Sequence, residues 1–216
     1  GSGSNNTAHA VELSKEAESI GADGLLVVTP YYNKATQKGL IRHYLTIADA
    51  VETPIIVYNV PSRTGVKCTA ETYAILAAHP NINGVKEASS DFALIADTHN
   101  LCPADFTVWS GNDEETAAIT LLGGKGVISV AANIVPREMH ALCELCFDND
   151  FVAAGNLQLK LSALLRALFC EVNPIPVKAG MSLLGLMSSE VRLPLSNATP
   201  QTVEIMKNTL EELGLL

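Results

Sequence analysis

The sequence contains no run of about 18 or more apolar residues, so no segment is predicted to span a membrane. It also lacks the pattern of a secretory signal peptide, because Gly1–Ser4 leads directly into polar residues. Positive charge is in deficit: 14 Lys and Arg face 23 Asp and Glu, which gives a formal net charge of −9. This balance argues against nucleic acid or an anionic membrane as a partner, although a local positive site can still attract a small anion.

Cysteines are few, and their spacing matches neither a disulfide framework nor a zinc site. They stand at positions 68, 102, 143, 146 and 170. Cys143 and Cys146 form a C-x-x-C, but this pair lies in helix-like sequence with no second pair downstream. The five histidines are isolated from one another. We therefore expect no metal, and we expect buried, reduced thiols, which suit a cytoplasmic protein.

Hydrophobic residues make up 48% of the 216 residues, enough for a sizeable core. Short apolar runs alternate with helical periodicity at intervals of roughly twenty to thirty residues, which predicts βα units and a parallel sheet buried on both faces. The predicted strands are Gly24–Thr29, Pro54–Tyr58, Ile82–Lys86, Phe106–Ser110 and Gly126–Val130. Beyond Val130 the pattern is all-helical, with helices expected at Pro136–Phe147, at Phe151–Cys170, in a proline-interrupted stretch to about Leu186, and at Pro200–Leu213.

Two α/β architectures fit this alternation: an open doubly wound sheet and a (β/α)8 TIM barrel. No G-x-G-x-x-G follows a strand, and Gly123–Gly126 precedes one, so we interpret it as a helix-to-strand turn. Tyr58, Lys86 and Gly111 fall at the carboxyl ends of successive strands, where barrel enzymes keep their sites. We therefore expect a partial barrel, lacking its first strands in this chain, as a catalytic domain in residues 1–148. A C-terminal helical domain is expected in residues 149–216.

Lys86 closes a predicted buried strand, where desolvation disfavours a charged ammonium and lowers its pKa. The neutral amine would be a nucleophile able to form a Schiff base with a carbonyl substrate. The ordinary alternative is a lysine that reaches the surface at a strand end. Tyr58 ends the preceding strand and Arg63 follows it, so a proton-transferring phenol and a carboxylate-binding guanidinium would face the same barrel mouth. This combination favours chemistry at Lys86.

In these residues the sequence resembles the dihydrodipicolinate synthase family of pyruvate-dependent class I aldolases, which is related to N-acetylneuraminate lyase. The resemblance runs over nearly the whole chain in the family's order. The family's opening strands, with their Thr-Thr-Gly-Glu-type loop, have no counterpart in this sequence. The matching stretches are Gly1–Thr7, Gly21–Asn33, Tyr58–Gly65, Gly84–Ala88, Ser110–Asp113, Leu121–Val130 and Asn173–Lys178.

The resemblance implies condensation of pyruvate with L-aspartate 4-semialdehyde to 4-hydroxy-tetrahydrodipicolinate, a step of lysine and diaminopimelate biosynthesis. Lys86 would form the pyruvate imine, Tyr58 would transfer protons, and Tyr32 would be donated across a tight dimer interface. No metal or organic cofactor is expected, because the lysine amine serves as the electron sink. The assembly implied is a homo-oligomer, a dimer of tight dimers.

The resemblance also assigns binding residues. Arg63 would hold the carboxylate of the aldehyde, and Ile128 and Gly111 would contact the substrates, Ile128 through its backbone. The related sialate lyases usually lack an arginine in this loop, so Arg63 favours aspartate semialdehyde. Another pyruvate aldolase of the family (an N-acetylneuraminate or 2-keto-3-deoxy sugar acid lyase) and a non-catalytic truncated fragment held in an oligomer stay open as alternatives.

A regulatory site is the last expectation. In lysine-inhibited relatives the helix that corresponds to the first helix of this chain lines an effector pocket at the tight dimer interface. Asn5 and Tyr31 match residues of that pocket, whereas His9 stands where the inhibited enzymes usually have a glutamate. Because the charge pair with the lysine ammonium is lost, we expect weak or absent lysine inhibition.

Overall fold

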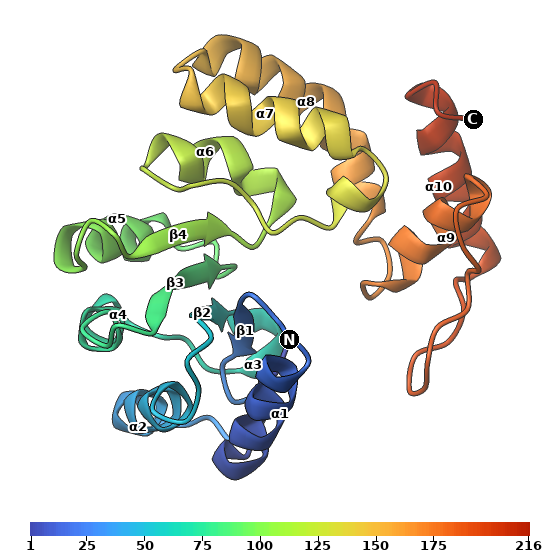
Figure 1. Ribbon diagram of the computed structural model, residues 1–216. Coiled ribbons are helices and arrows are strands. Elements are labelled where there is room, and N and C mark those ends of the chain that lie inside the picture. Colours follow the sequence, from blue (N-terminus) through green and yellow to red (C-terminus); the bar gives the residue numbers. More distant parts are fainter. The chain divides into compact units, whose positions relative to one another are not determined.

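The computed structural model describes residues 1–216, which form two compact units, Gly1–Ile128 and Ser129–Leu216 (Figure 1). The first unit is α/β and the second contains only helices. The predicted change to all-helical structure beyond Val130 is therefore confirmed. The predicted domain boundary between residues 148 and 149 stays a prediction; by compactness the chain divides after Ile128.

Four parallel strands form the sheet of the first unit, in the order β1-β2-β3-β4. They are β1 (Leu25–Val28), β2 (Ile55–Asn59), β3 (Ile82–Glu87) and β4 (Thr107–Ser110), which confirms four of the five predicted strands. The α/β class is confirmed as well. Strands that follow one another in sequence and in space form a barrel wall, whereas a doubly wound sheet reverses its order.

The fifth predicted strand, Gly126–Val130, is wrong as a strand. It forms a single parallel bridge, between Ser110 and Val127. Ser110 N donates to the Gly126 carbonyl at 2.9 Å and Ile128 N donates to the Ser110 carbonyl at 2.9 Å. The chain then turns into the 3-10 helix η2 (Ala131–Asn133), so pairing stops after this one residue.

Helices follow the strands as predicted. In the first unit they are α1 (Thr7–Ser19), α2 (Gln37–Ala48), α3 (Pro61–Thr64), α4 (Ala70–Leu76), α5 (Phe92–Leu101), the 3-10 helix η1 (Asp113–Glu115) and α6 (Thr116–Leu121). The side chains of Asn6, Thr36, Thr69 and Asp91 accept hydrogen bonds from the first turns of α1, α2, α4 and α5, which satisfies free backbone N–H groups. Figure 1 shows α2, α4 and α5 side by side along the sheet.

The sheet is apolar on the face that packs against these helices. The row Val27, Val57, Val85 and Val108 runs across the four strands in register, and each side chain is at most 1% exposed. Burying one such side chain stabilises the fold by about 1.5–3 kcal/mol. On the opposite face Leu26 and Val28 of β1 are only half-buried, so the prediction of a strand buried on both faces holds for one face.

The second unit is a helical assembly of η2, α7 (Pro136–Phe147), α8 (Phe151–Ala167), α9 (Ile175–Leu183) and α10 (Pro200–Glu212). Helix α8 contacts α7 and α10, and α10 contacts α9. At Gly180 of α9 an added Cβ would lie 2.7 Å from Met206 Cε and 2.8 Å from Ile134 Cδ1, so a larger residue there would displace the ends of these two side chains. No helix in residues 1–216 is long and apolar enough to cross a membrane.

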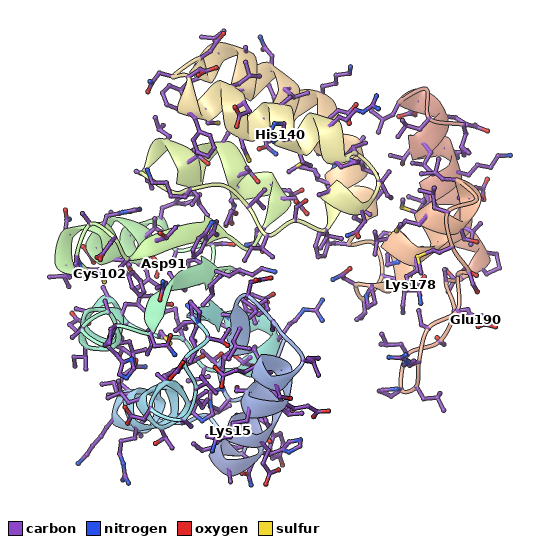
Figure 2. The ribbon with its side chains drawn as sticks, viewed as in Figure 1. Lys15, Asp91, Cys102, His140, Lys178 and Glu190 are labelled. Carbon is purple, nitrogen blue, oxygen red and sulfur yellow. The ribbon has the colours of Figure 1, made fainter.

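None of the five cysteines forms a disulfide. Cys68 and Cys146 are buried as expected, Cys102 and Cys143 are partly buried, and Cys170 is exposed, so the expectation of burial fails at Cys170. Figure 2 shows Cys102 directly after α5. Cys143 and Cys146 of α7 do not belong to any group of three or more potential metal ligands.

His43 of α2 makes the stability of the first unit dependent on pH. Its side chain is 5% exposed, and Nδ1 lies 2.9 Å from Thr7 Oγ1 of α1. Burial lowers the pKa of His43 to about 4, whereas an unfolded chain has a histidine pKa near 6.5. Below pH 6.5 the unfolded chain therefore takes up a proton that the folded chain does not, and the fold loses stability down to about pH 4.

We expect His43→Leu to remove this part of the acid sensitivity, which is at most about 3 kcal/mol. The measurement is urea unfolding of both proteins at pH 7 and at pH 4.5. His140→Leu, on the exposed side of α7, is the control. Between pH 7 and pH 4.5 this variant should lose as much stability as the unmodified protein. Equal losses in the unmodified protein and in His43→Leu would contradict the assignment.

Candidate active site

The sheet register brings the two principal candidates together. Tyr58 of β2 pairs with Lys86 of β3, and Lys86 pairs with Trp109 of β4, so all three lie in one row at the carboxyl ends of the strands. Their side chains lie on the face opposite the valine row, because neighbouring residues of a strand point to opposite faces. Lys86 Nζ lies 4.4 Å from the centroid of the Tyr58 ring, and Lys86 is only 9% exposed.

The surroundings shift the protonation of both groups. Burial lowers the pKa of the Lys86 amine; the Arg63 guanidinium lowers it further, while the Asp113 carboxylate opposes the shift. Burial raises the pKa of the Tyr58 phenol, and Arg63 partly opposes this effect. At neutral pH the amine therefore has a larger neutral, nucleophilic fraction than an ordinary lysine, while the phenol keeps a proton that it can donate.

Arg63 reaches this place from the short helix α3, directly after β2. The helix starts at Pro61, whose fixed φ suits a first turn, and it ends at Gly65, which adopts a φ of +75°. Arg63 itself is exposed, so its guanidinium is available to an anion from solvent. The neighbouring Thr64 is buried: it accepts a hydrogen bond at 3.1 Å from Thr29 Oγ1, which anchors α3 to the end of β1.

The structure does not bring Tyr32 into this pair. Tyr32 is 89% exposed and adopts a φ of +72°, an uncommon conformation for a residue other than glycine. Its backbone N–H donates to the Thr64 carbonyl at 3.1 Å, which holds the loop in place. The ring thus stands on the surface of this chain, and its role across a dimer interface stays a prediction.

Gly111 directly follows β4, and Ile128 directly follows the bridge residue Val127. Gly111 N donates to the Glu87 carbonyl at 2.7 Å, and an added Cβ would lie 2.6 Å from Ala88 Cβ, so the position requires a glycine. Ile128 is half-buried and its N–H already donates to Ser110. Any backbone contact of Ile128 with a substrate would therefore involve its carbonyl oxygen.

The effector candidates lie around the start of α1. Asn5 Nδ2 donates to Asn33 Oδ1 at 2.9 Å, and Asn33 Nδ2 donates to the Asn5 carbonyl at 3.0 Å, so this loop is tied to the loop after β1. His9 is exposed and its Nδ1 lies 3.3 Å from Glu12 Oε2. Tyr31 is 41% exposed. All three are accessible to a ligand, and their role stays a prediction.

Sequence reasoning missed two buried acids. Glu87, directly after Lys86, is 1% exposed, and Asp113 is 3% exposed in η1. The Asp113 carboxylate acts on Lys86, whose pKa it raises against the effect of burial. A glutamate at the end of a predicted buried strand was the available signal, because Glu is almost never buried without partners.

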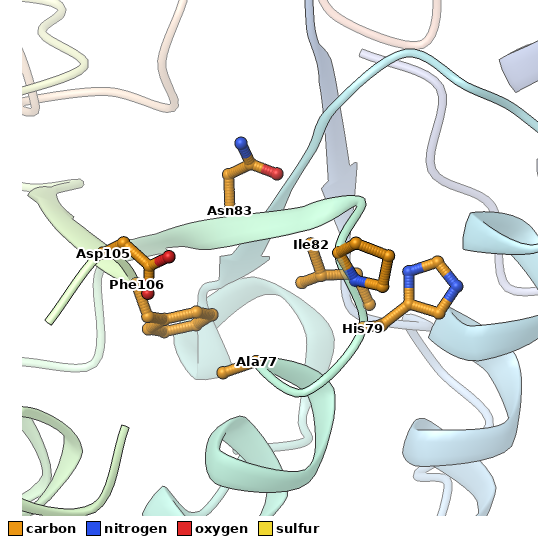
Figure 3. A pocket seen from close by; sticks show the side chains of 7 residues that line it. Ala77, His79, Ile82, Asn83, Asp105 and Phe106 are labelled. Atoms are coloured by element: carbon orange, nitrogen blue, oxygen red, sulfur yellow. The ribbon is translucent and has the colours of Figure 1, made fainter. Parts of the chain in front are cut away.

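Two pockets of the first unit lie near the amino ends of β3 and β4, away from Lys86 and Tyr58. One has a volume of about 130 Å³ and is lined by residues that include Ile82, at the start of β3, and Phe106, which precedes β4 (Figure 3). The other has about 250 Å³ and is lined by residues that include His99 and Thr107. Neither includes Lys86 or Tyr58; the candidate active site is placed at the carboxyl ends of the strands by the strand register and the contact between these two residues.

A barrel-type parallel sheet with a buried lysine amine over a tyrosine ring, at the carboxyl ends of adjacent strands, is typical of enzymes that bind carbonyl substrates as a lysine imine. Residues 1–213 match the Dihydrodipicolinate synthetase family. The chain belongs to this family.

Individual relatives agree with this assignment. The chain is 51% identical over 215 residues to the 4-hydroxy-tetrahydrodipicolinate synthase of Caldicellulosiruptor bescii, covering 100% of this chain and 72% of the relative. It is 47% identical to the enzyme of the same name from Thermotoga maritima, covering 100% of this chain and 75% of the relative.

Two solved structures are also similar to this chain in both sequence and fold. The crystal structure of dihydrodipicolinate synthase from Thermotoga maritima superposes with a TM-score of 0.97 at 47% identity, covering 100% of this chain and 74% of that one. A structure described as the first monomeric dihydrodipicolinate synthase variant gives the same TM-score, 0.97, and the same identity, 47%, covering 100% of this chain and 73% of that one.

We expect Arg63→Ala to raise the pKa of Lys86, because a nearby positive charge disfavours the ammonium. The pKa is read from the pH dependence of Lys86 carbamylation by cyanate, quantified on the digested peptide by mass spectrometry. Arg63→Lys keeps the positive charge and should keep the midpoint. A midpoint in Arg63→Ala at or below that of the unmodified protein would contradict the role of Arg63.

Proposed function

We propose that this chain is a 4-hydroxy-tetrahydrodipicolinate synthase that condenses pyruvate with L-aspartate 4-semialdehyde. The family match over residues 1–213 and relatives of that name at about 50% identity support the activity. The observation that carries the chemistry is the position of Lys86 Nζ, 4.4 Å above the Tyr58 ring in a buried row at the carboxyl ends of β2 and β3.

The first step is imine formation. The neutral Lys86 amine attacks the ketone carbon of pyruvate, and the resulting carbinolamine loses water to give the imine. The lowered pKa of Lys86 increases the fraction of neutral amine relative to an ordinary lysine. Loss of a proton from the pyruvate methyl group then gives an enamine, whose terminal carbon is the nucleophile of the next step.

Tyr58 is the proposed proton carrier. A phenol whose pKa is raised by burial stays protonated and donates its proton to the departing hydroxyl of the carbinolamine. The same side chain can take a proton back when the imine becomes an enamine. In this proposal the phenol returns to its starting state within the sequence of steps.

The second substrate is an aldehyde that carries a carboxylate, and Arg63 is its proposed partner. A guanidinium can bind a carboxylate through two parallel hydrogen bonds, which orients as well as attracts the ligand. The enamine carbon adds to the aldehyde to form a carbon–carbon bond. The amino group of the adduct then attacks the imine carbon, closes the ring and releases the Lys86 amine.

No step of this mechanism calls for a metal or an organic cofactor, because the protonated imine accepts the electron pair that enamine formation releases. The alternatives, another pyruvate aldolase of the family or a non-catalytic fragment in an oligomer, are not favoured by the names of the similar proteins.

A cytoplasmic location is proposed on the five cysteines, none of which forms a disulfide, because reduced thiols suit a reducing compartment.

Assembly into a homo-oligomer, as a dimer of tight dimers, is proposed on Tyr32. A ring that is 89% exposed on a hydrogen-bonded loop is available to a neighbouring subunit. One of the similar structures is a monomeric variant, so oligomeric state varies around this fold.

Weak or absent inhibition by lysine is proposed on His9, which offers no carboxylate at that position.

Pyruvate should be trapped on Lys86. Incubation with pyruvate and sodium borohydride reduces the imine to a stable secondary amine, and the modified peptide is located by mass spectrometry. Lys178, whose Nζ donates to the Glu190 carbonyl, serves as an internal comparison and should stay unmodified (Figure 2). Label on Lys34, Lys125 or Lys178 instead of Lys86 would disprove the assignment.

Arg63→Ala should weaken use of aspartate semialdehyde by about 2–4 kcal/mol of transition-state binding, because a charge-assisted pair is broken. That is a loss of roughly 30- to 700-fold in kcat/KM for the aldehyde. Trapping of pyruvate on Lys86 should survive. Equal activity of the unmodified protein on N-acetylmannosamine would instead favour the sialate-lyase alternative.

A further inference from the structure

The Glu87 carboxylate is the most completely hydrogen-bonded side chain near the candidate site, although it lies on the opposite face of the sheet. It is 1% exposed. Asn59 Nδ2 donates to Oε1 at 3.0 Å and to Oε2 at 3.1 Å. Tyr73 OH of α4 donates to Oε2 at 2.8 Å, and Ser89 N donates to Oε1 at 2.9 Å.

Every partner of Glu87 is a donor, so the cluster is built for a carboxylate. A protonated acid or an amide would turn a hydrogen toward the Asn59 Nδ2 or Ser89 N donors, unless the Tyr73 hydroxyl reversed its direction to accept it. Burial raises the pKa of Glu87, while the donors from Ser89, Asn59 and Tyr73 oppose that rise. Of the other ionisable groups that feel its charge, Lys67 is paired with Asp91 at 2.8 Å, and burial keeps the Cys68 thiol protonated by raising its pKa.

The cluster joins the ends of the two strands that carry Lys86 and Tyr58. Asn59 pairs with Glu87 in the register row directly after the Tyr58 and Lys86 row. Asn59 is itself fixed, because its Oδ1 accepts from Cys68 N at 3.2 Å and its carbonyl accepts from Ala88 N at 2.9 Å. The two strand ends are thus tied through the backbone and, on the helix side, through side chains.

Strand geometry carries this restraint to the other face. Adjacent residues project in opposite directions, so fixing the Glu87 side chain on the helix side fixes the direction in which Lys86 leaves the strand. The Lys86 side chain itself has a flexible stem of four carbons, which does not hold the amine in one place. The position of the amine above the Tyr58 ring therefore depends on the strand that carries it.

We propose that Glu87 is a positioning residue for the imine-forming lysine: its buried carboxylate clamps the carboxyl ends of β2 and β3 and so holds the Lys86 amine against Tyr58. This inference rests on the proposed function for its catalytic consequence. The geometric part, the placement of the amine, is independent of any substrate.

The test compares Glu87→Gln with a matched control in the full chain. Glu18 of α1 is the control, because its Oε1 accepts from Glu52 N, Thr53 N and Thr53 Oγ1 at 2.7, 2.8 and 2.9 Å, at the other end of β2. Glu18→Gln also removes a carboxylate that accepts several donors. We expect Glu87→Gln to slow pyruvate trapping on Lys86 by about 10- to 100-fold, as small misplacements of a reacting group do, and Glu18→Gln to leave it unchanged.

A second readout needs no substrate. The pH midpoint of Lys86 carbamylation by cyanate should rise toward that of an ordinary lysine in Glu87→Gln, because a displaced amine is less desolvated. It should not move in Glu18→Gln. If the unmodified protein is not trapped by pyruvate, the proposed function fails, whereas the cyanate midpoints still decide the placement of the amine.

Rescue separates positioning from general loss of stability. The exchange Asn59→Asp with Glu87→Gln restores a carboxylate facing an amide donor, and Asp at 59 can still accept from Cys68 N. The double variant should recover most of the trapping rate, while Asn59→Asp alone, with two facing carboxylates, should not.

Should Glu87→Gln fail to fold, Tyr73→Phe is the second variant. It removes one donor to Glu87 and should shift the trapping rate and the cyanate midpoint in the same directions by less. Unchanged rate and midpoint in Glu87→Gln, or equal losses in Glu18→Gln, would overturn the proposal.

Discussion

The register between β2 and β3 is the constraint on which the candidate site depends. It sets Tyr58 beside Lys86 on one face and, one residue later, Asn59 beside Glu87 on the other. A slip of one residue would send all four side chains to the wrong faces, placing an amine among the valines and an acid at the site. The alternation that buries the valine row therefore also places the candidate catalytic groups on one face and the Asn59–Glu87 cluster on the other.

Polar groups on both faces of these strand ends oppose folding, and the structure compensates for each in a different way. A buried carboxylate without partners would be strongly unfavourable, and Glu87 meets donors from a neighbouring strand, a helix and its own loop. The Lys86 amine instead lowers its pKa and lies over the Tyr58 ring. The donors around Glu87 oppose the rise in pKa that burial causes, whereas burial shifts Lys86 toward its neutral form, the form in which an amine is a nucleophile.

Much of this arrangement could be predicted from sequence, and the failures have physical reasons. Strands Leu25–Val28 and Ile82–Glu87 were recognisable because short apolar runs bounded by turn residues have few other uses, and Pro136 and Pro200 mark helix starts that the backbone obeys. Gly126–Val130 has the same composition as a strand, but it pairs with β4 only at Ser110 and Val127 before the chain turns into η2, and composition does not record where pairing stops. Glu87 was missed because its four hydrogen bonds come from three donor groups, at positions 59, 73 and 89, which only the fold brings together.

Arg63 connects the two halves of the proposed reaction through one charge. Its guanidinium lowers the pKa of both Lys86 and Tyr58 while its place on α3 stays open to solvent. A carboxylate bound to Arg63 would offset that charge, so the Lys86 amine would hold its proton more tightly and be a poorer nucleophile. In the proposed mechanism, an unoccupied Arg63 therefore favours the neutral amine that forms the imine. Once the imine exists, the same neutralisation raises the pKa of Tyr58 and keeps the phenol protonated for the carbon–carbon bond-forming step. The charge of Arg63 thus links the protonation of both candidate catalytic groups to the occupancy of the proposed carboxylate site.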